Sequence, residues 1–110
     1  MTPPARVERQ PRSACVEPYD DTAAVVHCVE ALWTAAGYGW ELAFMRSVVQ
    51  CESGWRPGAT GGAGEAGLFQ IHPVNWRLFA GRDPWDVVAN TEVALMLRRS
   101  AGWSPWSCAR

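Results

Sequence analysis

The chain has 110 residues, of which 48% are hydrophobic, and its net charge is −1 at neutral pH. This length allows one domain with a modest core, and the apolar fraction predicts a compact soluble protein. A near-neutral charge argues against a nucleic-acid binder, which normally carries a basic patch. No run approaches the roughly 20 apolar residues that a membrane-spanning helix needs, so we expect no membrane insertion.

Four cysteines in so short a chain predict two disulfides, and therefore a protein that functions in an oxidising environment. They are Cys15, Cys28, Cys51 and Cys108. Their spacing contains no Cys-x-x-Cys, so we expect no zinc site, and no His/Cys/Asp cluster suggests another metal or a cofactor. The sequence leaves three pairings open. We favour Cys15–Cys28 with Cys51–Cys108, in which the second bond ties the chain end to a helix.

The N-terminal 18 residues are polar and hold four of the eight prolines. We therefore expect residues 1–20 to form a poorly ordered arm and residues 21–110 to form the folded domain. The arm has no apolar core of signal-peptide length. Either another system exports the protein, or the chain is a piece of a larger one.

Hydrophobic spacing and helix-ending residues predict a mainly helical α+β fold. The expected helical segments are residues 21–36, 40–52, 73–80 and 85–100. Asp20 or Asp21 would cap the first, and Pro73 would open the third because proline is tolerated at a first helical position. Residues 56–66 hold four glycines and predict a loop or an irregular hairpin. Residues 67–71 are a short apolar run, for which we expect a strand or an extended segment.

Glu52 stands out because it continues the apolar stripe of the second expected helix. Met45, Val48 and Val49 lie at i, i+3 and i+4, and Glu52 follows at i+7. Gly54 predicts the helix end, where the negative end of the helix dipole disfavours a carboxylate. Burial and the dipole would both raise the pKa of Glu52, as a general acid requires near neutral pH. The alternative is a boundary glutamate that turns to water or pairs with an arginine.

A second acid, Glu65, lies across the glycine-rich loop, just before residues 67–71. A helix end and a short hairpin can face each other across a cleft with one carboxylate on each wall, which is the layout that cleaves a glycosidic bond. The candidates for binding the sugars, by stacking or hydrogen bonding, are Ser53, Trp55, Phe69, Gln70, Asn75, Trp76, Trp103 and Trp106. The alternative for Glu65 is a solvated side chain in a flexible loop.

The chain contains two motifs, Glu52-Ser53-Gly54-Trp55 and Gly67-Leu68-Phe69-Gln70-Ile71, separated along the sequence by the glycine-rich segment and followed by Pro73. Asn90, Ala94 and the closing Gly102-Trp103-Ser104-Pro105-Trp106 follow. This combination resembles the lysozyme-like superfamily. It is most similar to soluble lytic transglycosylase (SLT) domains and to cell-wall lysins of phages of actinobacteria, over about residues 22–108.

The resemblance implies a mainly α, lysozyme-like fold with about four helices and a small β element. It also implies a peptidoglycan glycosidase, a lysozyme (muramidase) or a lytic transglycosylase. Such an enzyme cleaves the β-1,4 bond between N-acetylmuramic acid and N-acetylglucosamine, with Glu52 as the catalytic acid. Gln70 matches a substrate-contacting position, and Asn90 matches a buried polar residue that shapes the cleft wall.

Glu65 departs from the transglycosylase pattern, which usually carries a non-acidic residue there. It is similar instead to the Asp that serves animal-type lysozymes as second carboxylate. If Glu65 points to water, the acetamido group of the substrate must stabilise the sugar cation.

The expected partner is peptidoglycan, and we expect the protein to act on it outside the cytoplasm. It would be secreted, released by phage or associated with a virion. We expect a monomer that needs no cofactor. The alternative is a non-catalytic glycan-binding module on the same fold.

Overall fold

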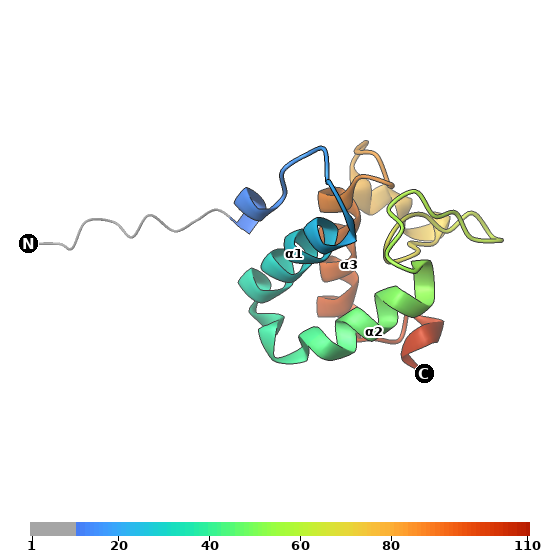
Figure 1. The fold of residues 1–110 in the computed structure, drawn as a ribbon. Coiled ribbons are helices and arrows are strands. Elements are labelled where there is room, and N and C mark those ends of the chain that lie inside the picture. Colours follow the sequence, from blue (N-terminus) through green and yellow to red (C-terminus); the bar gives the residue numbers. More distant parts are fainter. Residues whose placement is uncertain (1–10) are drawn as a thin grey trace, which may run out of the picture.

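The computed structural model describes residues 11–110. Its three α-helices are α1 (Thr22–Trp33), α2 (Leu42–Ser53) and α3 (Val87–Ala101), shown in Figure 1. Shorter 3-10 or π-helical turns are η1 (Pro11–Ala14), η2 (Thr34–Tyr38), η3 (Gly39–Glu41), η4 (Pro73–Phe79) and η5 (Ser107–Ala109). The expected mainly helical fold is therefore confirmed. The segment expected as a helix at residues 73–80 is a 3-10 helix, so three α-helices stand where about four helices were expected.

The expected strand at residues 67–71 is not formed. The described chain has only isolated bridges in this region, one of which pairs Ala66 with Ile71. The reason is a tight turn, because Gly67 has φ of 75° and Gln70 has φ of 48°. The chain folds back at once, and the Ile71 N–H donates to the Ala66 carbonyl at 2.9 Å.

Aspartate side chains fix where α1 and α3 begin. The Asp21 carboxylate accepts the Ala24 N–H at 2.9 Å, which confirms one of the two expected caps. The Asp86 carboxylate accepts the Ala89 N–H at 2.9 Å in the same way. The last helix consequently begins at Val87, two residues later than expected.

Glycines lie at or beyond the helix ends. Gly54, with φ of 62°, closes α2 as expected. Gly37, with φ of 96°, lies in η2, and regular α-helix stops at Trp33, three residues before the expected end at residue 36. Within residues 11–110, none of the resulting helices combines the length and the apolarity needed to cross a membrane.

The helices enclose a single aromatic core. α1 and α3 lie side by side, and α2 runs below them toward the C-terminus (Figure 1). Trp33 stacks on Phe69 with ring centres 5.2 Å apart, and Trp106 meets Phe69 edge-on at 6.2 Å. All three rings are almost fully buried. The glycine-rich loop extends away from this core, on the side where α2 ends (Figure 1).

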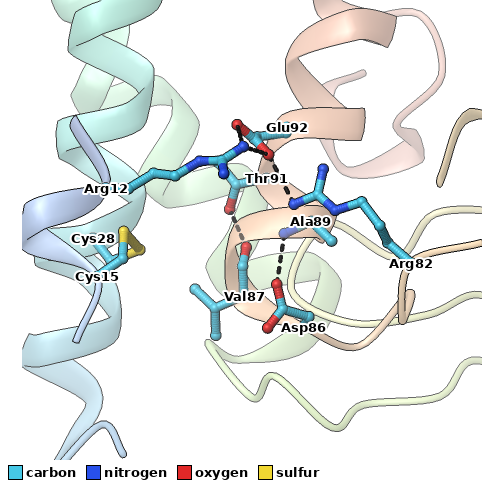
Figure 2. A network of polar contacts seen from close by, with 9 residues as sticks. All are labelled: Arg12, Cys15, Cys28, Arg82, Asp86, Val87, Ala89, Thr91 and Glu92. Carbon is cyan, nitrogen blue, oxygen red and sulfur yellow. Dashed lines mark hydrogen bonds and ion pairs between the residues drawn. A yellow bond between two sulfur atoms is a disulfide. The ribbon is translucent and has the colours of Figure 1, made fainter. Parts of the chain in front are cut away.

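Residues 11–20 contact the helical domain through an ion pair and a disulfide. Arg12 donates to both carboxylate oxygens of Glu92 on α3, at 2.6 Å each (Figure 2). Arg82, from the loop before α3, pairs with the same carboxylate at 2.8 Å. Residues 1–10, the other half of the expected arm, lie outside the described residues.

Both favoured disulfides are confirmed. Cys15–Cys28 joins the N-terminal segment to α1 (Figure 2). Cys51–Cys108 joins the last turn of α2 to η5, 57 residues further along the chain. The second bond therefore holds the chain end beside the residue that follows Cys51, which is Glu52.

Candidate functional site

Glu52 lies in the last turn of α2, half-buried, at the end of the stripe formed by Met45, Val48 and Val49. Those three apolar side chains are fully buried, so the stripe faces the core as expected. One carboxylate oxygen, Oε2, accepts the backbone N–H of Cys108 at 3.2 Å. Burial raises the pKa of Glu52, the hydrogen bond from Cys108 opposes this rise, and the nearby charge of Glu65 adds to it. The net direction is upward, which favours a protonated carboxyl group.

Glu65 lies in the glycine-rich loop and is held by backbone groups of its own loop. Its Oε1 accepts the Ala63 N–H at 2.7 Å. The N–H of Glu65 itself, followed by that of Ala63, holds the pKa of Glu65 below its usual range. The two acids therefore differ in protonation over a range of pH, with Glu52 protonated while Glu65 is ionised.

Gly61 brings the side chains of Glu65 and Gln70 to one place. A Cβ added at Gly61 would lie 2.6 Å from Gln70 Oε1 and 2.8 Å from Glu65 Oε1, so a side chain there would have to displace at least one of these two groups. Both hydrogens of the Gln70 amide have backbone acceptors, since Nε2 donates to Ala59 at 3.2 Å and to Gly67 at 2.9 Å. The amide oxygen of Gln70 is thereby fixed beside the Glu65 carboxylate.

Asn90 on α3 holds the backbone turn that carries Gln70. It is fully buried, and its Oδ1 accepts the Phe69 N–H at 2.9 Å. Its Nδ2 donates to the carbonyls of Ala66 at 2.8 Å and Pro84 at 2.9 Å. All these bonds go to backbone, so Asn90 fixes the turn that carries Gln70.

Residues 32–97 match the family model described as Transglycosylase SLT domain. The chain belongs to this family. Domains of this family are in general lytic transglycosylases that act on peptidoglycan in the cell wall, outside the cytoplasm, and two disulfides fit that location. No curated protein and no solved structure matches the chain.

The SLT match includes Glu52, Glu65, Gln70 and Asn90, but it ends before the C-terminal residues that contact Glu52. The contact between Cys108 and Glu52 is thus a feature of this chain outside the matched part of the SLT domain.

Several expected sugar-binding residues are buried in the SLT domain. The exposed fraction of the surface is below one tenth for each of five of them, namely Ser53, Trp55, Phe69, Asn90 and Trp106. Apolar rings gain most by leaving water, and these three aromatic side chains belong to the core cluster. In this conformation they support the site from inside the core, and their role in stacking on a sugar stays a prediction. Gln70, Asn75, Trp76 and Trp103 keep partial exposure.

Two further groups contact the residues of the site, the Trp85 side chain and the Cys108 amide. The analysis of the sequence did not identify either of them. The Trp85 indole donates to the Ala59 carbonyl at 3.1 Å, and its ring lies edge-on to Trp76, with centres 5.6 Å apart. The tryptophan content was visible in the sequence, but the partners of each ring were not. A backbone amide such as that of Cys108 leaves no signal in the residue type.

A pocket of about 380 Å³ is lined by Tyr19, Asp21, Thr22, Val25, Trp55, Arg56 and Pro57. Neither Glu52 nor Glu65 lines it, so it is separate from the two acids. Among residues 11–110, no three His, Cys, Asp or Glu side chains are grouped closely enough to hold a metal ion.

Proposed function

We propose that this SLT domain cleaves the β-1,4 bond between N-acetylmuramic acid and N-acetylglucosamine in peptidoglycan. The observation that carries the proposal is the half-buried position of Glu52 at the end of α2, within the part of the chain that matches the SLT domain. The opposite directions of the two pKa shifts, upward for Glu52 and downward for Glu65, support it. Glu52 donates its proton to the glycosidic oxygen as the bond breaks, and a raised pKa keeps that proton in place to a higher pH than on an ordinary carboxyl group. Glu65, ionised, lowers the energy of the positive charge that develops on the sugar.

The fate of the sugar cation decides between two products. Water added to the muramic acid carbon gives a reducing end, which is the lysozyme outcome. Attack by the 6-hydroxyl of the same sugar, with Glu52 now a carboxylate that accepts the hydroxyl proton, gives a 1,6-anhydro end. Family membership favours the anhydro product, since SLT domains are in general lytic transglycosylases. The loop bonds that hold Glu65 suit an electrostatic partner better than a nucleophile.

The glycan strand would contact the partly exposed residues near the two acids. Gln70 and Asn75 supply hydrogen-bonding groups for acetamido or hydroxyl substituents, and Trp76 and Trp103 supply aromatic surface. The enzyme would work as a monomer without a cofactor, whether secreted, released with phage or carried on a virion.

The test uses purified peptidoglycan and the variant Glu52→Gln, which keeps the shape of the side chain but cannot donate the proton. We expect its rate of fragment release to fall at least about 100-fold. Glu30→Gln is the matched control, because Glu30 lies on α1 away from the site and should keep the parental rate. A Glu52→Gln protein that degrades cell walls as fast as the parent rules the proposal out.

Mass spectrometry of the released fragments separates the two products, because the 1,6-anhydro end is one water lighter than the reducing end. Binding of peptidoglycan by the parent protein with no released fragment would instead indicate a non-catalytic glycan-binding module.

A further inference from the structure

The C-terminal residues reach back to the proposed catalytic acid. The Cys108 N–H donates to Glu52 Oε2 at 3.2 Å, although 56 residues separate the two. Within residues 11–110 this N–H has no backbone acceptor, unlike those of Ala109 and Arg110, which donate to the carbonyls of Trp106 and Ser107. Among the described residues, it is the hydrogen-bond donor that the structure records for the Glu52 carboxylate.

Two indole hydrogen bonds and a disulfide are among the contacts that hold this tail, which we define as residues 103–110. The Trp103 indole donates to Glu41 at 3.2 Å, and the buried Trp106 indole donates to the Phe69 carbonyl at 2.9 Å. The disulfide is Cys51–Cys108. Of these three contacts it lies nearest the acid, because Cys51 directly precedes Glu52 and Cys108 itself provides the amide.

We propose that the Cys51–Cys108 disulfide is a redox-sensitive latch that holds the Cys108 amide against Glu52, so that full activity requires the oxidised protein. Cys108 is thus a positioning residue, acting on the substrate only through Glu52. This inference rests on the proposed function, in which Glu52 is the acid.

A dithiol reductant opens the latch by transferring two electrons and two protons. The sulfur–sulfur bond breaks to give two thiols, and the reductant becomes a cyclic disulfide. Trp103 and Trp106 still anchor their part of the tail. Reduction therefore frees residues 107–110 to move, and the carboxyl group of Glu52 loses its fixed partner while the contacts of Trp103 and Trp106 remain.

The amide has a second effect, on the proton affinity of the acid. A hydrogen bond from an N–H favours the carboxylate form, so the Cys108 amide holds the pKa of Glu52 lower than burial alone would. The charged group that acts on Glu52 across the site is Glu65, and it remains in place when the latch opens. Loss of the amide at unchanged burial therefore raises the pKa of Glu52.

The first experiment compares two variants that each lack one disulfide. Cys51→Ser/Cys108→Ser opens the latch, and Cys15→Ser/Cys28→Ser keeps it. Activity on purified peptidoglycan is measured below the unfolding midpoint of both proteins. We expect kcat to fall about threefold to tenfold in the first variant, with KM nearly unchanged, while the second keeps the parental kcat. Dithiothreitol should lower the activity of the Cys15→Ser/Cys28→Ser protein to the same level, and reoxidation should restore it. Equal kcat in the two variants overturns the proposal.

The second experiment tests the contact without substrate. Carbon-13 NMR titration of the Glu52 carboxyl group reads its pKa directly in the same two variants. We expect a higher pKa in Cys51→Ser/Cys108→Ser, in which the amide is released, than in Cys15→Ser/Cys28→Ser, in which the latch holds it. Equal values in the two variants would show that the latch does not hold the amide against Glu52.

The two experiments also separate the possible failures. If the parent protein releases no fragment from peptidoglycan, the proposed function fails, but the titration still tests the contact. If the parent is active and both comparisons show no difference, the latch fails and the proposed function stands.

Discussion

The charge of Glu65 raises the pKa of Glu52, and the two carboxyl groups are shifted in opposite directions. Burial at the end of α2 accounts for most of the rise at Glu52, and loop N–H groups account for the fall at Glu65. A pair of titratable groups whose surroundings separate their pKa values can supply an acid and an anion at the same pH. The α2 end and the glycine-rich loop together provide this separation.

The variant Glu65→Gln tests the coupling between the two acids. It removes a negative charge near Glu52, so the pKa of Glu52 should fall. Because the general acid must be protonated, activity is lost as pH rises through that pKa, and the basic limb of the pH–rate profile should move to lower pH. Initial rates of fragment release across the pH range give the measurement, with Glu30→Gln as the control. An unmoved basic limb would show that the acid does not sense the charge of Glu65.

The variant Gly61→Ala tests the close approach of Gln70 and Glu65. The added Cβ would lie under 3 Å from an oxygen of each side chain, so at least one of them must move. We expect activity to fall about tenfold, because a displacement of this size misplaces groups at the site. Gly62→Ala is the matched control, since a Cβ there meets nothing within 4 Å. Equal activity of the two variants would mean that the close approach of Gln70 and Glu65 is not needed for catalysis.

The position of Glu52 could be predicted because helical periodicity alone determines which side chains share a face. Met45, Val48 and Val49 are buried, and Glu52 follows them on the same face. The turn after Gly67 could not be predicted in the same way. Its shape depends on a left-handed backbone at Gln70, which Asn90 supports from α3, and such a long-range contact has no local signal.

The aromatic residues show the same limit. The composition gives the number of tryptophans, but it does not show which of them are buried in the core. Trp55 and Trp106 join the core, whereas Trp40, which the sequence did not single out, is 76% exposed. The difference comes from tertiary packing, in particular from the tail that Cys108 and Trp106 hold against the core.

Asn90 should be important for stability as well as for the turn. Asn90→Ala removes the Asn90 partner of the Phe69 N–H and of the Pro84 carbonyl and leaves the Ala66 carbonyl with the Ile71 N–H alone, which should lower the free energy of unfolding by about 2 to 4 kcal/mol. Denaturant titration measures this change. Asn75→Ala, at a half-exposed position, should stay within about 0.5 kcal/mol of the parent. A small effect at Asn90 would indicate that water or a rearranged turn replaces its hydrogen bonds.

Glu41 and Arg98 form a buried ion pair that should control stability at acid pH. Arg98 Nε donates to Glu41 Oε1 at 2.9 Å, and only 6% of Glu41 is exposed. Burial alone would raise the pKa of Glu41, but hydrogen bonds from Arg98, Trp103 and Trp33 outweigh it, and the pKa lies below its ordinary value. A carboxyl group with a lowered folded-state pKa stabilises the protein above its unfolded-state pKa. That contribution is lost as pH falls through the folded-state pKa.

Removing Arg98 should reverse the sign of this pH dependence. In Arg98→Met the Glu41 carboxylate stays buried without its cation, which should lower the free energy of unfolding at neutral pH by about 3 to 5 kcal/mol. Its pKa then rises, so protonation at lower pH relieves the penalty. The double variant Arg98→Met/Glu41→Gln lacks the charge and should be more stable than Arg98→Met at neutral pH, with the gap closing as pH falls. Denaturant titrations of both variants at several pH values measure the gap, and a gap independent of pH would mean that Glu41 is not the group responsible.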